Sequence, residues 1–242
     1  IARTVVKSYL SFKDHKIGHA AIELQCLNQE GEKVTHEMTG MTDDGMNSFR
    51  SLFLKKDGFY ILFESFPGRL EKKEDLRVEF SKKFKRGRIS SASFMISRPT
   101  CSRLSEYLQE FRDGGYERHY GLVNRPRHRE GSGCSAFAKS FLDVAGIYNQ
   151  DFDKNWSYKI RIPEKFMGGP LTGEKVSFFK IFFDRDSRWA NQLERGFDLK
   201  FWDPDAMHSW VINKAGEIYG NKSFPKMRVL ERSYHLLYDK RD

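Results

Sequence analysis

The sequence predicts an α+β fold in which an antiparallel sheet packs on the helix that carries Cys134. Two observations lead to this prediction. Segments with the alternation of β-strands come early in the chain, and a glycine-rich turn later leads into an amphipathic helix. Strands followed by an apolar helix bury one face against it, which is the α+β arrangement. The hydrophobic share of 39%, with 21 Phe and 10 Tyr, argues against disorder.

The strands are predicted first, in chain order. From His19 to Cys26 the residues alternate, so that one face carries Ala20, Ile22, Leu24 and Cys26 and the other carries His19, Ala21, Glu23 and Gln25. A turn through residues 28–31 then leads to a second strand. Extended segments are expected at residues 3–11, 17–27, 33–39, 59–66 and 91–97, and helices at 46–54, 102–113 and 134–145.

The helix over residues 134–145 places Cys134 in its first turn. Apolar residues recur there at helical spacing, and Gly146 supplies a C-terminal stop. Unpaired backbone N–H groups and the positive end of the helix dipole stabilise a thiolate at this position, lowering a thiol pKa from about 8.5 toward 7. Cys134 also lies on the apolar stripe of the helix, so the alternative is a buried, inert cysteine.

His19 is the predicted partner of Cys134. A strand histidine set against a cysteine at a helix N-terminus is what a cysteine hydrolase needs, since the imidazole takes the thiol proton and later protonates the leaving group. The two residues are far apart in the sequence. Their pairing is therefore a hypothesis about the fold.

The segments around Cys134 resemble a known group of enzymes. Tyr120-Gly-Leu-Val-Asn124 and Gly133-Cys134-Ser-Ala-Phe-Ala-Lys-Ser-Phe-Leu-Asp-Val-Ala-Gly-Ile147 are similar to the Tyr-x-Leu, Asn/Asp-Cys-x-x-Phe and Ala-Gly-Ile signature of papain-like NlpC-type enzymes. Because the histidine strand precedes the cysteine helix, the order resembles the circularly permuted branch, which includes lecithin:retinol acyltransferase-like proteins. Two features depart from that branch: Gly133 stands where it often has Asn, and residues 125–132 resemble an insertion that would form a basic rim on the cleft.

This resemblance implies a permuted papain-like fold and a cysteine hydrolase that cuts amide bonds through a thioester, with peptidoglycan peptides as the substrate class. It also implies a third polar residue that orients the imidazole, on the strand after the histidine strand. His36 is our prediction for this role because the acyltransferase relatives use a histidine there. Glu23, Glu37 and Thr39 stay open as alternatives, since a one-residue slip of register exchanges the faces of a strand.

Further residues are candidates for contact with the oxyanion or the substrate. The family places a tyrosine near the oxyanion, which points to Tyr120, with a half-buried structural aromatic as the alternative. The backbone N–H of Cys134 is the second expected donor, because it is unpaired at the helix start. Ser135 and His208 complete the set, although a structural role is the favoured interpretation of His208.

The chain changes character at about Pro163, so residues 1–162 are predicted as the catalytic domain and 163–242 as an aromatic-rich C-terminal extension packed on it. A Pro/Gly-rich connection marks the start of the extension. Farther on, Asp203 and Pro204 predict the opening of a helix, as its cap and first helical residue.

The formal net charge of +9 favours acidic partners. Basic residues gather at 72–88 and 125–129, without zinc-finger spacing, an RNA-recognition signature or a helix-turn-helix pattern. No specific nucleic acid is therefore expected. The expected partners are a peptide or amide substrate and an anionic polymer or membrane surface.

The three cysteines, Cys26, Cys101 and Cys134, form no metal-spacing motif, and neither a metal nor a cofactor is expected. A bridge between Cys26 and Cys101 would indicate an oxidising compartment, but spacing alone does not establish it. The chain has no apolar run of about 18 residues, and it begins with Ile1, as a mature form without its signal peptide would. A periplasmic, cell-envelope or secreted location is expected.

Two other classes of function stay open at this point. An acyltransferase would use the same cysteine and histidine, with an amine in place of water resolving the thioester. A catalytically degenerate module would keep the fold and bind anionic surfaces, and an inert thiol at Cys134 would favour it.

Overall fold

The computed structural model describes residues 18–45, 55–84, 89–184, 186, 188–220 and 233–240. The predicted strand at 3–11 and the predicted helix at 46–54 lie outside these residues. The described part is a mixed α+β fold with an antiparallel sheet. That coarse prediction is confirmed.

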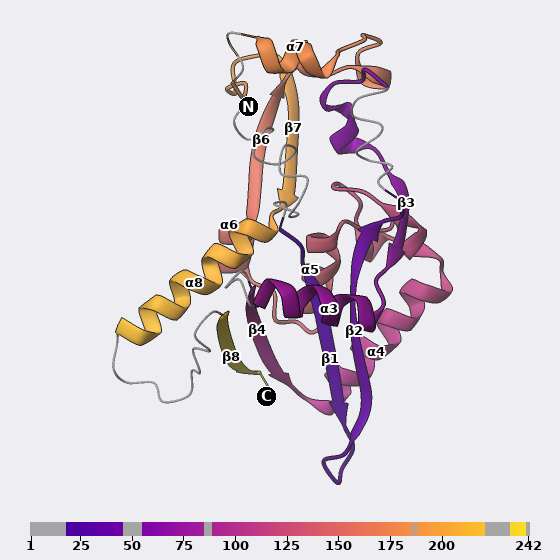
Figure 1. The fold of residues 1–242 in the computed structure, drawn as a ribbon, viewed down its shortest axis with the longest axis vertical. Helices are drawn as coiled ribbons and strands as arrows, with labels where there is room; N and C mark the ends of the chain where they lie inside the picture. The colour runs from indigo at the N-terminus through magenta and orange to yellow at the C-terminus, as the bar shows by residue number, and fades with distance from the viewer. Residues whose placement is uncertain are drawn as a thin grey trace.

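The main sheet has four antiparallel strands. They are β1 (Ala21–Leu27), β2 (Lys33–Asp43), β3 (Phe66–Leu70) and β5 (His119–Tyr120), in the order β1-β2-β3-β5. β1 and β2 form a long hairpin in which Ala21 lies opposite Gly40. His19 therefore lies just before the first paired residue, at the end of the hairpin that adjoins β3. The hairpin and β3 are seen side by side in Figure 1.

Two helices, α4 (Arg98–Asp113) and α5 (Cys134–Val144), pack on this sheet and form one core with it. The buried residues of this core are Leu24, Cys26, Met41, Cys101, Leu104, Leu108, Phe111, Phe137 and Phe141. The helix α3 (Lys73–Phe84) crosses in front of β1 and β2 in Figure 1. The prediction that the sheet packs on the cysteine-bearing helix is thus confirmed.

The ends of α4 and α5 follow their local sequence. α4 begins ahead of the predicted residue 102 because the Ser97 hydroxyl caps it, accepting the N–H of Thr100 at 3.4 Å, and a proline stands in its first turn. α5 ends one residue before the predicted position, where Gly146 takes a φ of 71°. The N–H of Gly146 then donates to Asp143 O, as a C-terminal stop requires.

The later part of the chain pairs with the earlier part in two small sheets. β6 (Ser157–Pro163) pairs antiparallel with β7 (Gly196–Trp202), and β4 (Ile89–Ile96) pairs in parallel with β8 (Ser233–Lys240). The helices α6 (Gln150–Trp156), α7 (Phe178–Phe183) and α8 (Pro204–Gly220) accompany them. Residues after 163 are therefore interleaved with residues before 163 in both sheets.

Figure 1 shows β6 and β7 as an arm that reaches α7, with α8 projecting to one side. α8 begins at Pro204, and Asp203 Oδ1 accepts the N–H of Asp205 at 2.9 Å. The predicted helix opening is thus confirmed.

One predicted strand is wrong. Residues 59–66 were expected to be extended, whereas Phe59–Phe63 forms the 3-10 helix η1 and β3 begins only at Phe66. The chain enters η1 through Gly58 at a φ of 57°, and Phe59 and Ile61 then turn into the apolar interior. The other 3-10 helices are η2 (Tyr116–Arg118), η3 (Pro126–His128), η4 (Glu164–Phe166) and η5 (Gly169–Leu171).

A disulfide joins Cys26 of β1 to Cys101 of α4, with an S–S distance of 2.02 Å, and Cys134 is free. The bridge between Cys26 and Cys101, which the spacing of the cysteines alone did not establish, is therefore present. Among the described helices, none has the length and apolar character that crossing a membrane would take.

Candidate active site

Cys134 is the first residue of α5, so its N–H has no acceptor within the helix. The preceding Gly133 is extended, and a Cβ on it would lie 3.1 Å from the carbonyl oxygen of Gly121. Gly133 thus lets the start of α5 approach the chain that follows β5. The side chain of Cys134 is partly exposed.

The side chain of His19 lies next to Cys134, and each group shifts the pKa of the other. The backbone of Ala20, the next residue, also acts to lower the pKa of Cys134. The segment leading into β1 thus presents an imidazole and a backbone donor to the same thiol. A Cβ on Gly18 would lie 2.6 Å from Asp205 Oδ1, so the start of α8 closes against this segment.

Glu71 completes the site. Its Oε2 lies 2.5 Å from Nε2 of His19. Two backbone bonds hold Glu71 against β2: its N–H donates to Gly40 O at 2.9 Å, and its carbonyl accepts the hydroxyl of the buried Thr39 at 2.9 Å. The structure therefore aligns Cys134, His19 and Glu71 in the order thiol, imidazole, carboxylate.

Gly40 makes room for this alignment. A Cβ at residue 40 would lie 2.7 Å from Oε2 of Glu71 and 3.0 Å from Nε2 of His19. Contacts of this length force one side chain of the pair to move. A glycine in the interior of a strand often marks such a close approach, and here the approaching atoms belong to the histidine–carboxylate pair.

His36 does not orient His19, and that prediction needs correction. Its Nε2 contacts Glu23 Oε1 at 2.6 Å, and His36 pairs with Gln25 in the β1–β2 register, farther along the hairpin than His19. The two histidines lie on the same face but are separated by the pleats between them. The carboxylate next to His19 comes instead from the residue that follows β3.

Tyr120 lies near the thiol, because Cys134 acts on the pKa of its hydroxyl. Burial and the negative charge of Cys134 raise the pKa of Tyr120 well above its usual range. It is therefore a neutral phenol that can donate. The buried Ser135 lies close as well, with its Oγ 3.8 Å from the Cys134 sulfur.

His208 is placed elsewhere. Its Nδ1 lies 2.8 Å from Oγ of Ser90, which joins α8 to β4. This contact agrees with the structural role that the sequence analysis favoured for it.

The electrostatics of the site favour an ion pair. Burial opposes charge on both partners, but the hydrogen bonds to Cys134 and Glu71 and their negative charge raise the pKa of His19 to about 10. For Cys134, burial is outweighed by the hydrogen bond and charge of His19 and by donors on Ala20 and Ser135, so its pKa is lowered. Both shifts, upward for the imidazole and downward for the thiol, favour a thiolate facing an imidazolium, as in activated cysteine nucleophiles.

The arginine-rich loop before Cys134 carries less uncompensated positive charge than the expected basic rim would. Arg125 pairs with Glu130 within the loop, and Arg129 contacts Glu110 of α4 at 3.1 Å. Both are exposed ion pairs. Much of the loop's positive charge is therefore compensated locally.

Glu71 and Gly40 are the site residues that the sequence analysis missed. Glu71 opens a strongly charged stretch that continues into α3, so nothing in its neighbourhood distinguishes it from a solvated carboxylate. The signal available for Gly40 was its position directly after the strand predicted at 33–39, which the structure extends to Asp43. In the part of the chain that the structure describes, no three His, Cys, Asp or Glu side chains gather as metal ligands would.

Comparison with known proteins yields no match among family models, curated proteins or solved structures.

Proposed function

We propose that the protein is a permuted papain-like cysteine hydrolase that cleaves amide bonds. The alignment of Cys134, His19 and Glu71 carries this proposal, because it joins a thiol at a helix N-terminus to an imidazole held by a carboxylate. The histidine strand comes before the cysteine helix, as in the permuted branch that the sequence resembles.

In the proposed reaction the Cys134 thiolate attacks the carbonyl carbon of the amide, and negative charge develops on the carbonyl oxygen. The N–H of Cys134 and the hydroxyl of Tyr120 are the donors offered to that oxygen. The C–N bond then breaks as His19 gives its proton to the departing amine, leaving a thioester. Water attacks the thioester, its proton passes to His19, and the carboxylic acid and thiolate are released.

Glu71 acts on the reaction through His19. Its carboxylate holds Nε2 of the ring and stabilises the imidazolium, as the third member of a nucleophile–base–carboxylate set does. It touches neither substrate nor thiol, and is therefore a positioning residue.

Peptides of the bacterial cell wall are the proposed substrate class. The resemblance to NlpC-type enzymes supports it, and the Cys26–Cys101 disulfide supports a periplasmic, envelope or secreted location, where such bridges persist.

Thiol alkylation tests the site first. We expect iodoacetamide to label Cys134 with an apparent pKa well below about 8.5, and the pKa to rise in His19→Ala. Slow labelling of Cys134, with an apparent pKa that does not change in His19→Ala, would contradict the proposal and favour a degenerate binding module.

Product analysis tests the reaction. With cell-wall peptides, the wild type should release a free amine and a carboxylic acid, whereas Cys134→Ala should release neither while keeping its thermal midpoint within a few degrees. Transfer of the acyl group to an added amine, without net hydrolysis, would assign the protein to the acyltransferases instead.

A further inference from the structure

α7 carries an exposed aromatic pair at the end of the β6–β7 arm. Its Ile181 is buried in an apolar cluster with Phe166 and Val176. The side chains of Phe179 and Phe183 are 67% and 73% exposed, and their rings stack 6.4 Å apart at an angle of 4°. Residues four apart share a helix face, so the buried residue anchors α7 while a rigid apolar edge faces outward.

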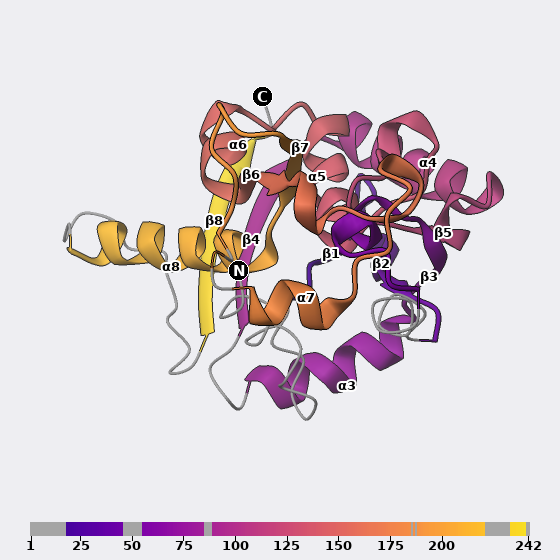
Figure 2. The same cartoon turned by 90° about the horizontal axis from the view of Figure 1, so that it is seen from above.

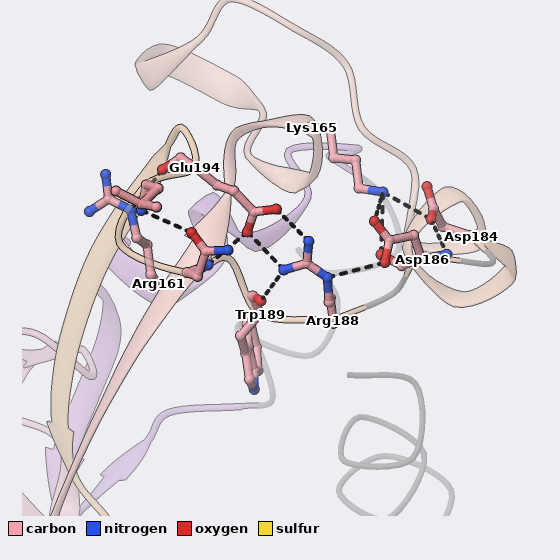
Figure 3. A network of polar contacts seen from close by, with 9 residues as sticks. Arg161, Lys165, Asp184, Asp186, Arg188, Trp189 and Glu194 are labelled. Carbon is pink, nitrogen blue, oxygen red and sulfur yellow. Dashed lines mark hydrogen bonds and ion pairs between the residues drawn. The ribbon is translucent and has the colours of Figure 1, made fainter.

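Positive charge surrounds this edge. The exposed Lys175 and Lys180 form no direct ion pair among the described residues, although the charge of Lys180 contributes to lowering the pKa of Asp184. The carboxylates that follow α7 are held by other cations: Lys165 contacts Asp184 at 3.0 Å, and Arg188 contacts Asp186 at 3.3 Å (Figure 3).

The same network binds Glu194, whose carboxylate Arg188 contacts with two nitrogens. The hydrogen bond from Arg188 lowers the pKa of Glu194 to about 2, and burial of the carboxylate opposes this shift only weakly. Lys165 and Arg188 therefore compensate Asp184, Asp186 and Glu194. Lys175 and Lys180 add positive charge to the edge, next to the exposed Glu174.

A second element with exposed cations, α3, lies on the same side of the molecule, although its first turn also carries the exposed Glu74 and Asp75. Figures 1 and 2 show α3 and α7 on one side, with α3 in front of the main sheet. Arg77 and Lys82 of α3 are exposed and, within the described residues, have no acidic partner. Val78 and Phe84 of α3 are exposed as well.

We propose that the α3–α7 face, defined by these exposed residues of α3 and α7 and by Lys175, docks on an anionic lipid bilayer. Phe179 and Phe183 enter the headgroup–acyl boundary, and the unpaired cations contact anionic headgroups. With six residues, α7 lies at the interface and does not cross it. A second copy of the chain is a poorer occupant, since it would set Lys175 and Lys180 against their own equivalents.

Vesicle flotation tests this docking with the full chain. The wild type should float with vesicles of mixed phosphatidylcholine and phosphatidylglycerol and stay behind with pure phosphatidylcholine. Phe179→Ser/Phe183→Ser should lower the partition coefficient at least about tenfold. The matched control is Leu27→Ser/Val34→Ser, which removes two exposed apolar side chains from the far end of the β1–β2 hairpin and should bind as the wild type does.

Charge reversal tests the second part of the surface. Lys175→Glu/Lys180→Glu should weaken flotation and reduce its dependence on salt, whereas Lys33→Glu on the hairpin should do neither. Iodoacetamide labelling of Cys134 should be unchanged in every variant. That readout shows that the fold is intact and separates this proposal from the proposed catalysis.

Three results would overturn the docking proposal. The first is flotation of the double phenylalanine variant at the wild-type level. The second is binding of the wild type to soluble polyglutamate but not to vesicles, which would assign the face to an acidic polymer. The third is a dimer in size-exclusion chromatography that the phenylalanine variant abolishes without any vesicle binding.

Discussion

Two histidine–carboxylate pairs on one sheet differ in their surroundings. The His19–Glu71 side chains are 16% and 12% exposed, whereas the His36–Glu23 side chains are 25% and 48% exposed. Coulombic attraction between the partners is screened by water in the second pair far more than in the first. Only the first pair also reaches a thiol. Burial and a third partner, and not the residue types, therefore distinguish the candidate catalytic pair.

Substitution of the two carboxylates tests this distinction. Glu71→Gln keeps the shape of the side chain but removes the charge that favours the imidazolium, so we expect the Cys134 pKa to rise and labelling near pH 6 to slow about tenfold. Glu23→Gln is the matched control and should change neither. The test is iodoacetamide labelling of Cys134 against pH. If labelling slowed equally in the two variants, His36 would again be a candidate for orienting His19.

The Cys134–His19 pair also predicts how stability varies with pH. Burial opposes its charge, but hydrogen bonds raise the pKa of His19 from 6.5 to about 10. Above pH 6.5 the folded protein thus keeps a proton that the unfolded chain loses, and stability falls as pH rises. Cys134 has a pKa lowered from 9.0, so below pH 9.0 the folded protein lacks a proton that the unfolded chain keeps, and stability rises with pH.

The two effects oppose each other where the pH lies below 9.0 and above both 6.5 and the lowered pKa of Cys134. We expect the pair's contribution to the free energy of unfolding to be constant there, to decline toward pH 10 as His19 loses its proton, and to decline in acid as the thiolate is protonated. Urea unfolding of the wild type and of Cys134→Ala/His19→Ala, compared across pH, measures this contribution. A contribution that changes steadily with pH through the neutral range would contradict this prediction.

At the scale of elements, β2 is the strand that assembles the site. It pairs with β1, which follows His19, and with β3, which precedes Glu71, so one strand sets the distance between the two side chains. Gly40 lies where they meet. The helix α5 then brings Cys134 to the same end of the sheet.

Gly40→Ala is therefore expected to disturb the site more than the fold. The new Cβ would lie 2.7 Å from Glu71 Oε2, which separates Glu71 from His19 and raises the Cys134 pKa. We expect labelling near pH 6 to slow about tenfold while the thermal midpoint changes by a few degrees. Gly216→Ala in α8 is the control, because its Cβ would meet nothing within 4 Å. Normal labelling in Gly40→Ala would show that the pair tolerates the extra methyl group.

At the scale of the whole molecule, the Cys26–Cys101 disulfide ties the hairpin that positions His19 to a helix of the core. It spans 75 residues of sequence and joins β1 to α4 within the cluster that also holds Phe137 of the cysteine helix. The bridge therefore stabilises the frame around the site without touching the reacting atoms.

Removal of this disulfide should cost stability and leave the thiol chemistry intact. Closing a loop of this length restricts the unfolded chain by about 4 kcal/mol. We expect Cys26→Ala/Cys101→Ala to lose stability of that order in urea unfolding, with an unchanged labelling pKa at Cys134. Cys134→Ala, which keeps the bridge, is the control. An unfolding midpoint insensitive to the loss of the bridge would contradict its structural role.

Local sequence was sufficient for much of the fold. The alternation from His19 to Cys26 predicted β1, the apolar spacing after Cys134 predicted α5, and Asp203–Pro204 predicted the start of α8. These signals lie within a few residues, because strand alternation, helix periodicity and caps are local properties. The prediction of a strand at 59–66 was wrong because a short apolar run also fits a 3-10 helix that buries apolar residues.

By itself, the sequence determined the α+β class and the placement of Cys134 at a helix N-terminus, and it predicted His19 as the partner of the thiol. Only the tertiary structure decided that Glu71 and not His36 faces the imidazole, that Gly40 admits the pair, and that Cys26 is bridged to Cys101. The physical reason is that these contacts join segments far apart in the chain. Strand register and helix docking set their distances, and neither is encoded within any one segment.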